Sequence, residues 1–172
     1  MKSRTPKELQ PIAGKPVIDY VLRAAQPLRP AQTIVVLSPA KAGLHEQLPA
    51  ECLVAWQEEQ LGTADAAARA LPLLAEKIER VAILFGDHPL LLPETVQRLV
   101  ELSETSGALV TLLTTRLSDP AGYGRLVYEG ERIVDLIEAR EDRRVYDGPV
   151  EINSGISCYD RRWLETSLPK ID

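Results

Sequence analysis

The segment that decides the fold is Val81-Ala82-Ile83-Leu84-Phe85-Gly86-Asp87-His88-Pro89-Leu90-Leu91. Its apolar run ends at Gly86-Asp87, and Pro89 cannot donate to a continued strand ladder. A short run of this kind is typical of a strand that is buried on both faces of a parallel sheet. Because open α/β sheets bind ligands beyond the carboxyl ends of their strands, we expect Asp87 at a binding site. A carboxylate there suits a divalent cation held over phosphates.

Apolar strands and amphipathic helices alternate through the first two thirds of the chain. Strand patterns cover residues 33–37, 52–56, 81–85 and 108–115, and helical patterns cover 17–28, 63–74 and 93–103. Thr63 is the expected N-cap of the middle helix. This alternation predicts a mainly parallel sheet with right-handed crossovers, in the Rossmann-like class.

The pattern changes after about residue 120. Residues 125–128 and 132–137 flank Glu129-Gly130-Glu131 and predict a hairpin. A further strand at 150–159 and a short helix at 162–168 complete the chain. The sequence therefore predicts one domain with an inserted β element in its second half.

Composition sets limits on the class of protein. The chain has 172 residues and a net charge of -5, which suits one globular domain and gives no electrostatic footprint for nucleic acid. No apolar stretch is as long as a membrane span, and Met1-Lys2-Ser3-Arg4 is not a secretory signal. Cys52 and Cys158 are therefore expected as reduced thiols in a cytoplasmic protein.

Several short segments in register along the chain carry a family resemblance. They are Pro6-Lys7-Glu8-Leu9, Ile12-Ala13-Gly14-Lys15-Pro16, Gln57-Glu58-Glu59-Gln60-Leu61-Gly62-Thr63-Ala64, Phe85-Gly86-Asp87-His88-Pro89-Leu90, Gly122-Tyr123-Gly124-Arg125, Ile137-Glu138-Ala139 and Glu151-Ile152-Asn153-Ser154-Gly155-Ile156. Together they resemble the pyrophosphorylase domain of the bifunctional N-acetylglucosamine-1-phosphate uridyltransferases and glucosamine-1-phosphate acetyltransferases. The resemblance covers essentially the whole chain.

The resemblance implies a fold with two departures from the family pattern. The family opens with a strand and a glycine-rich loop that would precede Met1, and it continues into an acetyltransferase β-helix domain. We therefore expect residues 1–172 to form a partial nucleotidyltransferase domain, an α/β, Rossmann-like three-layer structure with a mixed, mainly parallel sheet. It would lack the first strand and the glycine-rich loop. Since that first strand is central in the family, its absence predicts a gap in the sheet.

The implied reaction is the transfer of a uridylyl group from UTP to N-acetylglucosamine 1-phosphate, with Mg²⁺ as cofactor. Its expected partners are these two substrates, without nucleic acid or membrane, and a homo-oligomer is expected for the full-length form. Two alternatives stay open at this point. One is another sugar-phosphate nucleotidyltransferase, and the other is a non-catalytic nucleotide or sugar-phosphate binder.

The resemblance also assigns residues to the nucleotide. Asp87 would be the metal ligand and Lys7 would contact the phosphates, which makes these two the expected catalytic residues. Gln57, Gly62 and Thr63 resemble the part of the family site that binds uracil, because an amide offers both a donor and an acceptor to a pyrimidine. Phe85 and Gly86 would line the same pocket as these three residues.

The sugar is assigned to Gly124, Glu138 and Asn153. Glu138 could equally be a solvated acid on the hairpin. Asn153 lies in an otherwise apolar strand, where a buried amide without a hydrogen-bond partner costs free energy. The family usually has Lys and Asp where this chain has Arg140 and Glu141. Arginine does not substitute simply for lysine, so the identity of the sugar depends on how this loop is built.

Overall fold

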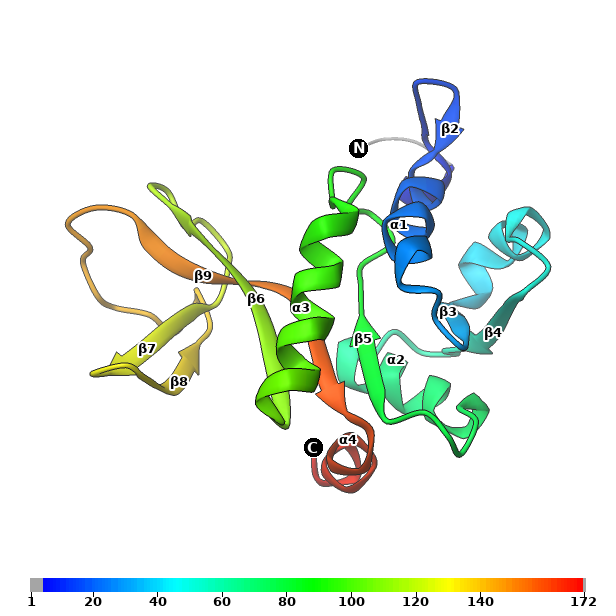
Figure 1. The fold of residues 1–172 in the computed structure, drawn as a ribbon. Helices are drawn as coiled ribbons and strands as arrows, with labels where there is room; N and C mark the ends of the chain where they lie inside the picture. The colour runs from blue at the N-terminus through cyan, green and yellow to red at the C-terminus, as the bar shows by residue number, and fades with distance from the viewer. Residues whose placement is uncertain (1–4, 172) are drawn as a thin grey trace.

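The structure is a computed structural model that describes residues 5–171. Its main body contains most of the helices, and a smaller part, built around β7 and β8, lies to one side (Figure 1). The long strand β9 (Val150–Asp160) runs from the smaller part into the main body. The α/β class predicted from the sequence is confirmed.

The two longer helices of the main body pack against each other. Helix α1 (Val17–Ala25) follows Pro16, and its residues Val17, Ile18, Val21 and Ala24 form one buried stripe at helical spacing. Helix α3 (Pro93–Ser106) has proline at its first position and ends at Gly107, which adopts the left-handed conformation common after a helix. The two helices contact each other directly.

A two-stranded parallel sheet forms one edge of the main body. Strand β3 (Thr33–Leu37) pairs with β4 (Cys52–Trp56), and both have the bounds that the sequence predicts. The loop between them is a 3-10 segment over Pro39–Gln47, which the sequence analysis missed. Helix α2 (Thr63–Ala70) packs on both strands. Its N-cap is Gly62, so the prediction that Thr63 caps this helix was wrong.

A five-stranded sheet contains the remaining long strands. They are β5 (Arg80–Ile83), β6 (Val110–Leu117), β7 (Arg125–Glu129), β8 (Arg132–Ile137) and β9. Strand β9 pairs antiparallel with β5, β6 and β7, and β7 and β8 form the expected hairpin. Helix α4 (Arg161–Ser167) follows β9 directly and is capped by the Asp160 side chain.

The short elements complete the chain. The hairpin of β1 (Pro11–Ile12) and β2 (Lys15–Pro16) turns at Ala13 and Gly14, both with positive φ. Single 3-10 turns occupy Lys7–Leu9, Gln26–Leu28, Leu71–Leu73 and Leu168–Lys170. In the described part of the chain, no helix is long and apolar enough to cross a bilayer.

Strand direction departs from the sequence-based prediction. The sheets are mixed, but within residues 5–171 only the β3–β4 pair is parallel, so the expectation of a mainly parallel sheet was wrong in this detail. The reason is that β5 takes β9 as its partner, from far along the chain, and makes no ladder with β3. Alternation of strands and helices along the sequence does not reveal such a long-range antiparallel pair.

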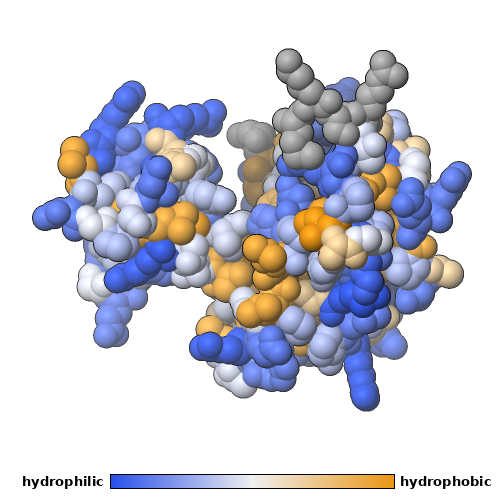
Figure 2. Space-filling model, turned by 90° about the horizontal axis from the view of Figure 1, so that it is seen from above, coloured by the Kyte–Doolittle hydropathy of each residue, from blue (hydrophilic) through white to orange (hydrophobic). Residues whose placement is uncertain are grey.

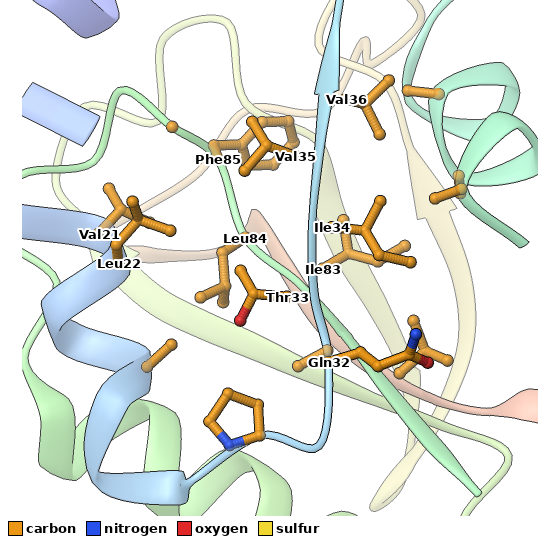
Figure 3. Close-up of a pocket in the computed structure, with 18 of the residues that line it drawn as sticks. Val21, Leu22, Gln32, Thr33, Ile34, Val35, Val36, Ile83, Leu84 and Phe85 are labelled. Atoms are coloured by element: carbon orange, nitrogen blue, oxygen red, sulfur yellow. The ribbon is translucent and has the colours of Figure 1, made fainter. Parts of the chain in front are cut away.

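A cavity of about 1540 Å³ separates the two sheets of the main body. Figure 3 shows β3 on one side of it, Leu84 and Phe85 beyond the end of β5 on another, and Val21 and Leu22 of α1 closing a third. Val81 and Ile83 are therefore only half-buried and Ala82 is exposed, although the sequence predicted a strand buried on both faces. The gap expected in the sheet thus lies between β3 and β5.

The best-packed core lies on the side of β5 that faces away from the cavity. Leu99 of α3 packs on Ile156 and Cys158 of β9, and all three side chains are buried. Leu84 and Phe85 contact this cluster from the chain that follows β5. The core thereby fixes the carboxyl end of β5, which is the place where the sequence puts its candidate metal ligand.

Candidate functional site

An ion pair marks the carboxyl edge of β5. The Lys7 Nζ atom lies 2.8 Å from Asp87 Oδ2, although the two residues are 80 positions apart. The hydrogen bond from Lys7 lowers the pKa of Asp87, and the same bond raises the pKa of Lys7. Both groups are therefore charged near neutral pH, and both stay open to solvent, with side chains 64% and 33% exposed.

Gly86 allows the chain after β5 to lie close to Ile18 and Glu8. A Cβ at this position would lie 3.0 Å from Ile18 Cδ1 and 3.4 Å from Glu8 Cγ, tighter than ordinary packing. The Glu8 carboxylate accepts a hydrogen bond from Lys41 Nζ at 2.7 Å. Its other oxygen is buried and has no hydrogen-bond partner within residues 5–171. Sequence reasoning missed Glu8 and Lys41, because an isolated acid and lysine carry no spacing signal.

Gln57 organises the loop that leads into α2. This residue is buried, and its Nε2 atom donates to Gly62 O at 3.0 Å and to Asp65 Oδ2 at 2.9 Å. These two bonds occupy both amide hydrogens, so only the amide oxygen of Gln57 is left to contact a base. Gly62 has φ +107 and Thr63 begins the helix beside it. The three residues assigned to uracil therefore form one local unit.

Phe85 links the end of β5 to β9. A Cβ on Gly155, which has φ +83, would overlap the Phe85 ring, so glycine is required for this contact. The Phe85 ring also packs on His88, with ring centroids 5.4 Å apart. We call Lys7, Gln57, Gly62, Thr63, Phe85, Gly86 and Asp87 the β5-edge group. All seven line the cavity between β3 and β5.

The residues assigned to the sugar lie together in the smaller part. The backbone N–H of Asn153 donates to Gly124 O at 2.9 Å. The side-chain oxygen Oδ1 of Asn153 accepts from the backbone N–H of Gly155 at 2.9 Å. A Cβ on Gly124 would lie 3.8 Å from Glu138 Oε1, and 2.9 Å from Leu136 Cδ2. We call these three residues the β7–β9 group. Gly124 precedes β7, Glu138 follows β8 and Asn153 lies in β9, so three strands bring them together.

Strand β9 connects the two groups. Asn153 lies near its start, whereas Ser157 pairs with Ile83 at the end of β5. Viewed from the top of Figure 1, the smaller part and the main body are separated by a notch, and apolar residues gather where they join (Figure 2). The β7–β9 group and the end of β5 are therefore linked through one strand.

The residues that can hold a metal ion are few. Within residues 5–171, no three side chains of His, Cys, Asp or Glu form a cluster able to hold one. Magnesium does not require such a cluster, because it is usually bound by one or two carboxylates together with substrate phosphates and water. Asp87, half-open to solvent at the edge of the sheet, fits this mode of binding.

The loop after β8 contains functional candidates that sequence reasoning missed. Asp142 is almost fully buried and contacts Arg125, Arg144 and Tyr146. By contrast, Arg140 and Glu141 pair with each other at 3.4 Å and lie 84% and 62% exposed. The sequence shows only a run of mixed charge here, and nothing in its spacing marks Asp142 as the buried member.

A family model describes this architecture. Residues 1–150 match the MobA-like NTP transferase domain. The chain belongs to this family. It is a nucleotidyltransferase domain, which confirms the enzyme class predicted from the sequence motifs.

Curated relatives of this NTP transferase domain are longer proteins. The chain is 41% identical over 174 residues to the bifunctional protein GlmU of Alcanivorax borkumensis, and 40% identical over 172 residues to that of Heliobacterium modesticaldum. These alignments cover 99% of the chain but only 37% and 38% of the relatives. The chain thus resembles their pyrophosphorylase region, as its motifs predict.

Solved structures share the fold at low sequence identity. A CMP:2-keto-3-deoxy-manno-octonic acid synthetase complexed with CTP matches with a TM-score of 0.72 and 18% identity, over 96% of this chain and 72% of that one. A putative glucose-1-phosphate thymidylyltransferase from Bacillus anthracis matches with a TM-score of 0.76 and 14% identity, over 99% and 72%. At these identities the likeness concerns the fold alone.

Proposed function

We propose that this domain transfers a uridylyl group from UTP to N-acetylglucosamine 1-phosphate, with Mg²⁺, and releases pyrophosphate. The product, UDP-N-acetylglucosamine, would feed peptidoglycan synthesis in the cytoplasm. The observation that carries the proposal is the Lys7–Asp87 pair, which puts a cation and an anion side by side at the edge of β5. The similarity to the GlmU proteins supports the choice of UTP and of the amino sugar.

The chemistry asks little of the protein beyond placement. An oxygen of the sugar phosphate attacks the α-phosphorus of UTP, the bond from this phosphorus to the β-phosphate bridging oxygen breaks, and pyrophosphate leaves. Such transfers depend on positioning and on neutralising negative charge. Mg²⁺, when bound, would neutralise charge on the phosphates, and Asp87 would hold it there. Lys7 would then give up Asp87 and donate to a phosphate oxygen.

The remaining residues would select the two substrates. In the β5-edge group, the amide oxygen of Gln57 would accept from the uracil ring, and Gly62 would let the backbone approach it. In the β7–β9 group, the Glu138 carboxylate and the Asn153 amide would bond the sugar hydroxyls and the N-acetyl group. A side chain at position 124 would meet Leu136 Cδ2 at 2.9 Å, so glycine avoids a shift of Leu136 next to the sugar.

Calorimetric titration of UTP tests the proposal directly. We expect wild-type binding to require Mg²⁺, and Asp87→Asn to lose the metal dependence while keeping the thermal midpoint of the wild type. Asp147→Asn, an exposed acid in a distant loop, is the matched control and should bind as the wild type does. Pyrophosphate release with UTP and a panel of sugar phosphates then reports turnover.

The outcomes separate the alternatives. Preference for CTP, GTP or dTTP would replace the uridine assignment by another sugar-phosphate nucleotidyltransferase. Tight Mg²⁺-dependent UTP binding without pyrophosphate release would identify a non-catalytic binder. Unchanged magnesium dependence in Asp87→Asn would remove this residue from the metal role.

A further inference from the structure

Asp142 is the centre of a network of charged and polar side chains in the loop after β8. Its side chain is 3% exposed, yet it accepts hydrogen bonds from Arg144 Nε at 2.8 Å and from Tyr146 Oη at 2.5 Å. Arg125 Nε lies 3.3 Å from its Oδ2 atom. The bonds from Arg144 and then Tyr146 hold the pKa of Asp142 far below its usual range. Asp142 is therefore ionised throughout the physiological range, and its charge is shared among three partners.

Arg125 anchors this network to the sheet. It is the first residue of β7, its side chain is 10% exposed, and its guanidinium donates to the backbone oxygens of Ala121 and Tyr123. Through Arg125, Asp142 is tied to the segment that contains Gly124. A buried arginine that spans two backbone oxygens and a carboxylate has little freedom to move.

Glu138 is attached to the same network through the backbone. The amides of Glu141 and Asp142 both donate to Glu138 O, at 2.9 Å and 3.1 Å. Residues 138–142 therefore form one tight turn, whose far end is Asp142 and whose near end lies against Gly124. Whatever fixes Asp142 therefore also holds the backbone at Glu138, from which the Glu138 carboxylate projects.

We infer that Asp142 and Arg125 are positioning residues that set the Glu138 carboxylate for a hydroxyl-bearing sugar phosphate. The inference rests on the proposed function, in which Glu138 contacts the sugar. The exposed side chains of Arg140 and Glu141 pair with each other. We therefore assign the positioning of Glu138 to Asp142 and not to these two residues. Sugar specificity at the β7–β9 group then depends on a carboxylate that never touches the substrate.

Paired ligand titrations test the inference. Asp142→Asn keeps the shape of the side chain but removes the charge that Arg125 and Arg144 surround. We expect the affinity for N-acetylglucosamine 1-phosphate to fall about tenfold through misplacement of Glu138, while the affinity for UTP changes by less than about twofold. Glu141→Gln, in the same turn but exposed, is the matched control and should leave both affinities unchanged.

Hydrogen exchange gives a second measurement that needs no ligand. In Asp142→Asn the amides of residues 141 and 142 should exchange about tenfold faster, because their bonds to Glu138 O open more often. Tyr146→Phe, which removes a single bond to Asp142, should give a smaller change of the same kind. Arg125→Lys, which cannot span the same acceptors, should behave like Asp142→Asn.

Each result bears on a different statement. Equal sugar-phosphate affinity in wild type and Asp142→Asn would overturn the positioning role, and so would an equal loss of UTP affinity, which would indicate general damage. A wild-type chain that binds UTP but no sugar phosphate would overturn the proposed function and, with it, this inference. Faster exchange in Asp142→Asn with weaker sugar binding alone is the result that supports the inference.

Discussion

The two candidate groups are held in place by opposite means. The β5-edge group stands at the border of a cavity, and its Lys7–Asp87 pair is open to solvent. The β7–β9 group is held by backbone pairs between three strands and by a buried charge network. Order in the smaller part therefore comes from satisfied polar groups, whereas the main body leaves apolar strand surface uncovered. We expect the β3 side of the main body to open first, since local stability follows packing.

The joint between the two groups should show the largest effect. Gly155→Ala should lower the free energy of unfolding by about 2–4 kcal/mol, because its Cβ overlaps the Phe85 ring and its φ is +83. Gly130→Ala has φ +62 but nothing within 4 Å, so it should cost only about 1 kcal/mol. Urea denaturation measures both, and similar losses would show that Phe85 can move aside.

Removal of the Lys7 ammonium separates ligand binding from stability. Lys7→Ala should weaken UTP affinity about tenfold in the presence of Mg²⁺, because a phosphate loses its cationic partner. The free energy of unfolding should fall by less than about 1 kcal/mol, since the Lys7–Asp87 pair is exposed. Lys170→Ala is the control for removing an exposed lysine. A large loss of stability without loss of UTP affinity would contradict this assignment.

Filling the cavity should stabilise the main body. Ala67→Leu points additional carbon atoms from α2 into the cavity and should raise the free energy of unfolding by about 1 kcal/mol. Ala68→Leu, exposed on the same helix, should change it by less than about 0.5 kcal/mol. Guanidinium titrations compare the two variants. Destabilisation by Ala67→Leu would mean that the space is too constrained for a larger side chain.

The smallest expected effect is a change in how the stability of the chain depends on pH below pH 6. The pKa values of Asp87, Asp65 and Asp142 are all lowered from 3.8 in the folded chain, so the unfolded chain binds more protons below about pH 5. The stability that these carboxylates contribute is present above pH 3.8 and is lost as the pH falls toward their folded values. Thermal midpoints between pH 6 and pH 3 should therefore decline less steeply in Asp142→Asn than in wild type. Parallel curves would show that Asp142 contributes nothing to the acid response.

Local patterns were sufficient to predict much of the fold. Strands β3 and β4 and the β7–β8 hairpin follow from runs of apolar residues and a glycine turn, and α3 from its opening proline. The motif around Asp87 also predicted its place beyond β5. The family resemblance assigned Lys7 and Asp87 to the same nucleotide, but their direct ion pair was not predicted, because no physical rule joins residues 80 positions apart.

Other features had no signal in the sequence. The antiparallel β5–β9 pair depends on which distant strand reaches β5, and alternation of elements does not decide that. Asp142 lies in a polar run that resembles a solvated turn, and its burial depends on Arg125, which belongs to a different strand. The N-cap of α2 is Gly62 and not Thr63: Gly62 has φ +107, outside the helical range, and the helix begins at Thr63.

The continuity of β9 has a consequence for the chemistry. Asn153 and Ser157 belong to the same strand, and the register shift opposite β6, with Gly155 at φ +83, lies between them. In the proposed function, this shared strand would hold the sugar site and the β5 edge at a set separation, whatever the surrounding loops do. A new sugar specificity could then arise by exchange of residues in the loop after β8, without any change in this separation.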